Sequence, residues 1–256
     1  MSIRSSFRPV WILAVALGFF SQSAPSHGQI LVQHLADTDP LTEGFTFEAF
    51  GNQPGLSAVN DGGTPAWQIL DDNSPSAEGG RYKYQSLSLA QEASLLQNGF
   101  FARAKFRMAS VFSNSNPPTD YNVELNVTLN TQRRFVLQWN LSADGDPIVF
   151  GSGDGSPVVE VNGAGSGYHD WIYDYTGTLN GGIGKLFMDG QFVFQWTGFA
   201  DSFGPEYQFE GPRTSGTVNW TVGQLGSGNQ VLPEPNGLAL AVGAGLVLLR
   251  SRRMRG

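Results

Sequence analysis

The chain has 256 residues, a formal net charge of −7 and no cysteine. The lack of cysteine excludes disulfides and also thiolate groups, whether as metal ligands or as nucleophiles. The excess of acidic residues argues against binding to nucleic acid or to anionic lipid surfaces.

Residues 1–28 have the layout of a secretory signal peptide. Arg4 and Arg8 precede an uninterrupted apolar run, Val10 to Phe20, and a polar stretch follows it. The run has 11 residues, whereas a transmembrane helix needs about 20. Small residues at the end of the polar stretch predict cleavage by signal peptidase after Gly28. A buried N-terminal helix is the alternative.

Residues 29–228 form the predicted folded part, and their number fits one all-β domain better than two. Two of the 15 basic residues lie in the signal region and four lie after residue 228, which leaves nine. Of the 22 acidic residues only Glu234 lies outside, which leaves 21 and a net charge near −12. This charge suits a neutral glycan, a cation or a basic partner, although solubility alone would also account for it.

Alternation of apolar and polar residues predicts antiparallel strands through most of this domain. In the clearest case, Tyr121 to Asn130, apolar residues at odd positions alternate with Asn, Glu and Thr at even positions. We expect the odd face to be core and the even face to be solvated. Similar patterns predict further strands at 44–50, 66–70, 81–87, 100–108, 134–141, 147–150, 158–161, 168–175, 185–188, 191–196 and 217–222. A short helix is predicted at 89–96.

The stretch LFMDGQFVF, Leu186 to Phe194, predicts a tight hairpin. Its Asp189-Gly190 pair can adopt the two positive φ angles of a type I′ turn, which places Phe187 opposite Phe192. One side of the ribbon is then expected to carry Phe187, Phe192, Phe194 and Trp196, and the other Leu186, Met188 and Val193. Since both sides are apolar, the ribbon is expected to lie between two layers or beneath a ligand surface.

Two segments, Tyr173 to Gly177 and Leu186 to Gly190, resemble the laminin-G and concanavalin A-like jelly roll. Members of that superfamily often combine an aromatic-Asp corner with a later Asp-Gly hairpin. The resemblance implies an antiparallel β-sandwich of two stacked sheets, with the first and last strands adjacent. Residues from the two ends of the domain are then expected to meet, namely Phe45 and Phe47 with Val218, Trp220 and Val222.

The resemblance also sets an expectation about catalysis. Glycosidases with this fold place their carboxylates on one strand in a Glu-x-Asp-x-x-Glu pattern, and the chain has no such run. Asp170 and Asp174 come nearest, but they lie four residues apart along one strand, a distance of about 13 Å. His169 alternates with aromatic residues and is predicted to be a hydrogen-bonded core residue. We therefore predict a protein that is not an enzyme, with a glycoside hydrolase or lyase as the third choice.

Acidic residues in the Gly-rich segment 144–167 form a candidate calcium site, because calcium prefers several flexible oxygen ligands. They are Asp144, Asp146 and Asp154. Ordinary turn chemistry of Asp-Gly pairs is the alternative. The sequence has no paired-histidine metal motif and no phosphate-binding loop.

Aromatic side chains stack on the apolar faces of sugar rings, while neighbouring amides and carboxylates fix the hydroxyls. Six aromatic residues are candidates for such a platform, namely Trp67, Tyr82, Tyr84, Phe192, Phe194 and Trp196. A place in the core is the alternative for each of them, so exposure in the folded domain decides.

Residues 229–256 hold a Pro-Glu-Pro triplet, an apolar run from Gly237 to Leu249 and a cluster of arginines. As a helix the 13-residue run is about 20 Å long against a hydrocarbon core of about 30 Å, which suits transient membrane contact at residues 237–249. This order of features resembles the PEP-CTERM sorting signal of Gram-negative bacteria. The residues that carry the resemblance are Pro233, Glu234, Pro235, Arg250, Arg252 and Arg253.

The resemblance implies that an exosortase cleaves the tail and passes the protein to the cell surface or to an exopolysaccharide matrix. A Pro-rich linker before a simple tail anchor is the alternative. Taken together, the sequence predicts a secreted jelly-roll domain that binds carbohydrate or a protein partner without catalysis. The main rival is a structural matrix component with no specific ligand.

Overall fold

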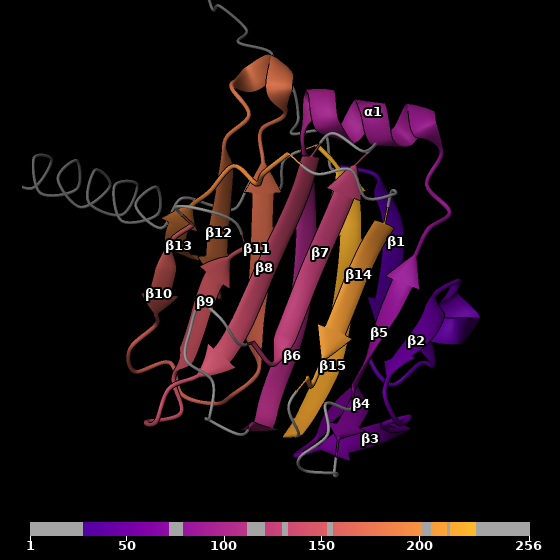
Figure 1. Cartoon of the computed structure of the whole chain (residues 1–256), viewed down its shortest axis with the longest axis vertical. Helices are drawn as coiled ribbons and strands as arrows, with labels where there is room; N and C mark the ends of the chain where they lie inside the picture. The colour runs from indigo at the N-terminus through magenta and orange to yellow at the C-terminus, as the bar shows by residue number, and fades with distance from the viewer. Residues whose placement is uncertain are drawn as a thin grey trace, which may run out of the picture.

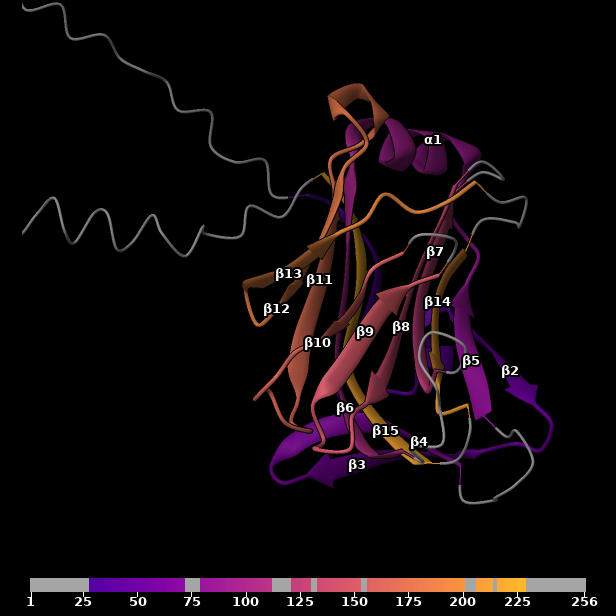
Figure 2. The same ribbon diagram turned by 60° about the vertical axis from the view of Figure 1, so that its left-hand side comes forward.

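Two antiparallel β-sheets stack face to face in the computed structural model of the chain (Figures 1 and 2). The predicted signal peptide, apart from Gly28, the predicted sorting tail and Asp154 all lie outside the described residues. The structure describes residues 28–71, 79–111, 121–129, 133–152, 156–200, 206–213 and 216–228. Within these ranges no helix is long and apolar enough to cross a membrane.

The first sheet has the strand order β13-β12-β11-β6-β15-β4-β3, and β1 also pairs with β15. Its longest strands, β6 and β15, run side by side through the middle of the sheet. The bounds in chain order are β1 (Ile30–Leu35), β3 (Gly55–Asp61), β4 (Thr64–Asp71), β6 (Phe100–Val111), β11 (His169–Tyr175), β12 (Gly184–Met188), β13 (Gln191–Gln195) and β15 (Gly216–Ser227).

The second sheet has the order β10-β9-β8-β7-β14-β5-β2. Its central strands β8, β7 and β14 carry strict alternation, so one set of side chains enters the core and the other points away from the sandwich. The bounds are β2 (Thr46–Phe50), β5 (Gly79–Tyr84), β7 (Val123–Leu129), β8 (Arg133–Leu141), β9 (Pro147–Gly151), β10 (Val158–Glu160) and β14 (Glu206–Gly211).

Short helices close the ends of the sandwich. The helix α1 (Leu89–Asn98) begins at a capping box, in which Ser88 Oγ accepts from the Gln91 amide and Gln91 Oε1 accepts from the Ser88 amide. It lies across one end of the two sheets (Figure 1). The 3₁₀ turns are η1 (Pro40–Glu43) and η2 (Thr178–Asn180). The predicted short helix is thus confirmed and is slightly longer than expected.

Aromatic rings fill the space between the sheets. Phe209 from β14 stacks on Trp220 from β15, with ring centroids 4.4 Å apart and planes 11° apart. Phe106 from β6 lies edge-on to Phe209 and to Trp139 from β8. Such aromatic pairs contribute about 0.5–1.5 kcal/mol beyond the burial of their area. This packing stabilises a cysteine-free fold through its core.

The predicted jelly-roll sandwich is confirmed. The first strand β1 pairs with the last strand β15, as the resemblance implied. Phe45 meets Trp220 with ring centroids 5.8 Å apart, whereas Phe47 packs on Tyr82 at 4.9 Å. Three strands were not predicted from the sequence, namely β1, β3 and β14.

The β12–β13 hairpin has the predicted turn, with φ angles of 50° at Asp189 and 79° at Gly190. Phe187 pairs with Phe192 as expected, but Leu186 then pairs with Phe194, because a β-bulge adds Val193 to β13. The extra residue turns Phe194 and Trp196 into the core beside Leu186. The predicted face of these two aromatic residues is therefore wrong.

Candidate functional site

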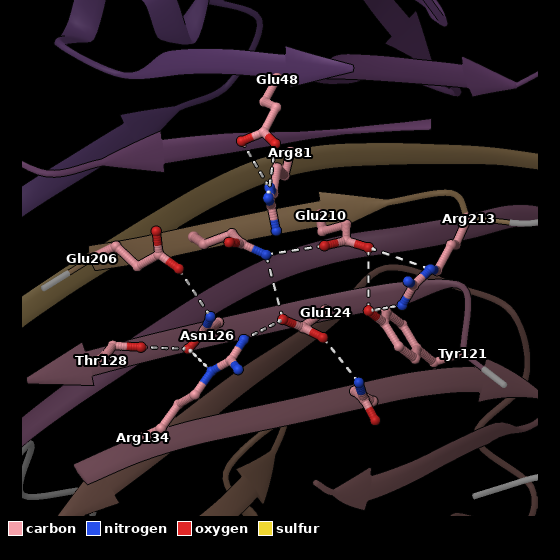
Figure 3. A network of polar contacts seen from close by, with 12 residues as sticks. Glu48, Arg81, Tyr121, Glu124, Asn126, Thr128, Arg134, Glu206, Glu210 and Arg213 are labelled. Atoms are coloured by element: carbon pink, nitrogen blue, oxygen red, sulfur yellow. Dashed lines mark hydrogen bonds and ion pairs between the residues drawn. The ribbon is translucent and has the colours of Figure 1, made fainter. Parts of the chain in front are cut away.

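Polar side chains line the outward face of the second sheet, on β7, β8 and β14 (Figure 3). We expected the even positions of 121–130 to be solvated. Instead the exposed fraction of Glu124 is only 3%, and Asn126 and Thr128 are fully buried. The expectation is wrong because neighbouring strands supply hydrogen-bonding partners, which allow polar groups to be buried.

Two carboxylates lie side by side at the centre of this face. Glu124 on β7 and Glu210 on β14 are direct partners in the strand register. The amide of Gln208 bridges them, because its Nε2 donates to Glu124 Oε1 at 3.3 Å and to Glu210 Oε2 at 3.0 Å. Two acidic groups that share one donor cannot both be ionised cheaply in a buried place.

The pKa of Glu210 lies well above its ordinary value. Burial, and next the charge of Glu124, raise the pKa of Glu210 to about 7. Tyr121 donates to Glu210 Oε1 at 3.3 Å, and Arg213 lies 4.0 Å from the same oxygen and also donates to the Tyr121 hydroxyl. Glu210 therefore changes its charge near neutral pH, within a network that holds its orientation.

Glu124 is held from its other side. Gln138 Nε2 on β8 donates to Glu124 Oε2 at 2.9 Å, and Arg134 Nη2 lies 3.8 Å from Glu124 Oε1. Arg134 Nε also donates to Asn126 Oδ1, and Asn126 Nδ2 donates to Glu206 Oε1, both at 3.3 Å. These hydrogen bonds connect β8, β7 and β14 into one network.

The network continues to the rim of the sheet on β2 and β5. Arg81 forms a two-pronged contact with Glu48, with Nε to Oε2 at 3.2 Å and Nη2 to Oε1 at 2.9 Å. Hydrogen bonds from Arg81 and then Lys83 lower the pKa of Glu48 to about 2. Four acidic and four basic residues thus meet on this face, which is close to electrically neutral; they are Glu48, Glu124, Glu206, Glu210, Arg81, Lys83, Arg134 and Arg213.

One acceptor in the network has no partner. Gln208 is fully buried, and its Oε1 makes no hydrogen bond to any described residue. Its amide nitrogen is committed to the two glutamates. A buried carbonyl oxygen without a partner costs about 1–3 kcal/mol, a cost that the other hydrogen bonds of the network offset.

The predicted aromatic platform does not form. Trp67 and Tyr82 are core residues, and Trp67 Nε1 donates to the Tyr82 hydroxyl at 2.7 Å. Phe194 and Trp196 are also in the core, so none of these four offers a free ring face. Tyr84 is half-buried against Phe45. Phe192 alone among the six candidates is well exposed, at 57%, and it lies on the edge strand β13, on the other sheet from the polar network.

The candidate calcium residues serve a turn. Asp146 accepts from the backbone amides of Gly163 at 2.7 Å and Gly165 at 2.6 Å, and these bonds lower its pKa. Asp144 lies exposed in the preceding turn. Within the part of the chain that the structure describes, no three His, Asp or Glu side chains gather as a metal site. The two described carboxylates therefore give no preformed calcium site, and Asp154 lies outside the described residues.

The histidine and aspartates of β11 have structural contacts. His169 Nδ1 lies 2.8 Å from Asp189 Oδ2, and its Nε2 lies 3.0 Å from the Gly165 carbonyl. Asp170 accepts two bonds from Arg103, both at 2.7 Å. These contacts fix the hairpin and the outer face of the first sheet. The expected hydrogen-bonded role of His169 is confirmed.

Sequence reasoning missed the residues that form the network. The alternation in 121–130 predicts only a solvated position for Glu124, and Glu210 lies on a strand that the sequence does not predict. The signal was present in EYQFEG, Glu206 to Gly211, where Tyr and Phe alternate with Gln and Glu. Only the strand order shows that this segment lies beside Tyr121 to Leu129.

Comparison with known proteins finds the same fold among solved structures. No protein-family model matches the chain, and no curated protein sequence matches it. Among solved structures, a mutant of HCR/D superposes with a TM-score of 0.51 at 8% identity, over 82% of this chain and 51% of that one. The chain has the concanavalin A-like jelly-roll fold.

Two further solved structures are similar to this jelly roll. Domain 4 of an extracellular arabinanase from Geobacillus stearothermophilus, in complex with arabinotriose, gives a TM-score of 0.49 at 10% identity, over 81% of this chain and 96% of that one. The β-glucanase of Bacillus licheniformis gives 0.44 at 10% identity, over 78% and 99%. At these identities the likeness extends to the fold alone.

Proposed function

We propose that this chain is an exported protein of the outer cell surface or extracellular matrix of a Gram-negative bacterium. Residues 1–28 direct export, and an exosortase processes the tail at residues 229–256. The order of Pro-Glu-Pro, short apolar run and arginine cluster supports this proposal. The domain is compatible with cleavage after Gly28, because its first strand, β1, begins at Ile30.

The jelly-roll domain, in this proposal, binds a neutral glycan on the outward face of β2, β5, β14, β7 and β8. The observation that carries it is the charge-balanced network around Glu124 and Glu210, whose rim residues Glu48, Arg81 and Arg213 are partly exposed to solvent. Sugar hydroxyls both donate and accept, so they suit a face where carboxylates alternate with guanidinium and amide groups. A balanced face gives no electrostatic preference to polyanions or polycations.

A glycan microarray probed with the full chain, with and without calcium, tests this proposal. Arg81→Ala removes a rim cation of the network and the two-pronged contact that positions Glu48, so it is expected to weaken binding at least severalfold. Arg103→Ala is the matched control, because Arg103 makes the same two-pronged contact with Asp170 on the other sheet. Equal loss in both variants would contradict the assignment to this face.

A protein partner or a structural role without ligand remains the alternative, and a flat response on the array favours these. Glycoside hydrolysis is the third candidate, and the observation that favours it is the pair of neighbouring carboxylates, Glu124 and Glu210. Direct partners in antiparallel strands have Cβ atoms about 4.5–5.5 Å apart, and retaining glycosidases hold their carboxyl groups about 5–5.5 Å apart. Release of reducing sugar by the wild-type chain and its loss in Glu210→Gln would replace the binding role with catalysis.

A further inference from the structure

Both ends of the folded domain meet at one end of the sandwich. The Ser227 amide donates to the Gln29 carbonyl at 2.9 Å, and the Gly228 amide donates to the carbonyl of Gly99, directly after α1, at 3.0 Å. Gly177, just before η2, packs on the last turn of α1, where a Cβ atom would come within 2.4 Å of the Gln97 carbonyl oxygen. Figures 1 and 2 show α1 and the orange η2 turn together at this end.

The segments next to the two chain termini carry almost no charge, and Arg133 lies beside them near Tyr175. We call this end of the sandwich the neutral end, and it consists of segments 28–31, 88–99, 176–183 and 226–228. Their 27 residues include a single charged side chain, Glu92, which is fully buried. A chain in which 14% of residues are charged would place about four there. The domain has a net charge near −12, and nearly all of its charged residues therefore lie outside these four segments.

Apolar side chains stand out into solvent on the neutral end. Leu89 at the start of α1 is 70% exposed, Leu179 in η2 is 72% exposed and Ile30 is 44% exposed. The outward face of α1 adds Ala90, Ser94 and Gln97 and no charge. A surface helix ordinarily carries charged residues on its solvent face. The neutral end thus has the character of a surface that meets an apolar or interfacial environment.

The chain itself determines what this end meets. Eight residues, 229–236, separate Gly228 from the apolar run at Gly237. At about 3.3–3.6 Å per residue they reach at most about 30 Å. When residues 237–249 are in a bilayer, the neutral end is consequently the part of the domain tied closest to it. Anionic headgroups repel an acidic domain, and the uncharged end minimises that repulsion.

We propose that the neutral end is a membrane-facing surface, with Leu89 and Leu179 in contact with the lipid headgroup region before the tail is cleaved. This inference rests on the proposed function of the tail. It orients the domain, so that the polar network extends along the side of the sandwich and stays open to ligands.

The lack of cysteine makes a direct test simple. Full chains with a single cysteine, Leu89→Cys, Leu179→Cys or Ala143→Cys, are labelled with a fluorophore and mixed with vesicles of phosphatidylcholine and phosphatidylglycerol that carry a spin label on the headgroup. Ala143 is exposed in the turn after β8, at the opposite end of the sheet. We expect loss of fluorescence at positions 89 and 179 and none at position 143.

Flotation of the vesicles distinguishes failure of the membrane-facing surface from failure of the tail proposal. A chain that floats with the vesicles only when residues 229–256 are present, but is quenched equally at all three positions or at none, supports the tail proposal and overturns this inference. A chain that does not float overturns both. Leu179→Ser in the Leu89→Cys background is expected to weaken quenching at position 89 while the circular dichroism of the domain stays unchanged. Quenching that is unaffected by this change contradicts a contact shared by the two leucines.

Discussion

At the scale of single residues, Glu210 links the stability of the domain to pH. Its pKa of about 7 in the folded chain lies above its ordinary value of 4.5. Between these values the folded state binds more protons than the unfolded state, so the free energy of unfolding falls as pH rises from 4.5 through 7. Glu210→Gln keeps the neutral form, and we expect it to gain on the order of 3 kcal/mol over wild type at pH 8 relative to pH 4. Urea unfolding at both pH values measures this.

Glu48 provides the control on the same sheet face. Its pKa is lowered to about 2, so its contribution is present above pH 4.5 and is lost only as the pH falls through 2. Glu48→Gln is therefore expected to leave the difference between pH 5 and pH 8 unchanged. If wild type and Glu210→Gln lose stability equally over that range, another group binds the proton.

The polar network also shows why single residues are hard to interpret from sequence. Glu124 alternates with Val123 and Leu125, and its polarity indicates solvent in any strand with one wet face. The structure places Gln208 and Gln138 from the two neighbouring strands on its oxygens. Those partners are 84 and 14 residues away in sequence. Burial of a charge depends on such partners, and only the strand order reveals them.

At the scale of elements, the β12–β13 hairpin depends on a glycine with positive φ. Gly190 has φ of 79°, and a Cβ atom there would meet nothing within 4 Å. Gly190→Ala is therefore expected to lower the free energy of unfolding by about 1–2 kcal/mol through backbone strain alone. Gly167 is the matched control, since it is equally open but lies outside the positive-φ region. Gly167→Ala is expected to be neutral or slightly stabilising, by up to about 1 kcal/mol.

Thermal and urea unfolding of the two variants decide this point. Equal stability of both would show that the turn tolerates an L-residue at Gly190, and the type I′ assignment would then be wrong.

Elements with strong alternation or a defined turn were predictable, and those set by a single extra residue were not. The strand at 121–130 and the Asp189-Gly190 turn follow from period-two alternation and turn chemistry. The exposed strand β3, in contrast, has no clean alternation. The bulge at Val193 changes which aromatic residues reach the core, yet QFVFQ has at least one apolar residue on each face, so the sequence does not show the bulge. Packing against Tyr173 selects the observed one, because the Tyr173 hydroxyl donates to the Trp196 carbonyl.

At the scale of the whole molecule, the sandwich separates three surfaces. The second sheet carries the polar network, the first sheet carries ion pairs such as Arg103 with Asp170, and the neutral end holds both chain termini of the domain. Because β1 begins at Ile30 and β15 ends at Ser227, removal of residues 1–28 and of the tail leaves every described strand intact. The fold is therefore compatible with processing at both ends.

Processing of the tail gives the last prediction. Proline has a fixed φ and no amide hydrogen, so Pro233-Glu234-Pro235 favours an extended backbone in front of the apolar run. In a host with an exosortase, the wild-type chain is expected at the surface or in the medium without residues 237–256, as intact mass shows. Replacement of the triplet by alanines is expected to leave the full mass in the membrane fraction, whereas Asn229→Ala with Gln230→Ala is processed normally. Identical processing of the alanine-triplet variant and wild type would contradict the sorting role, as would a wild-type chain that stays uncut in the cytosol.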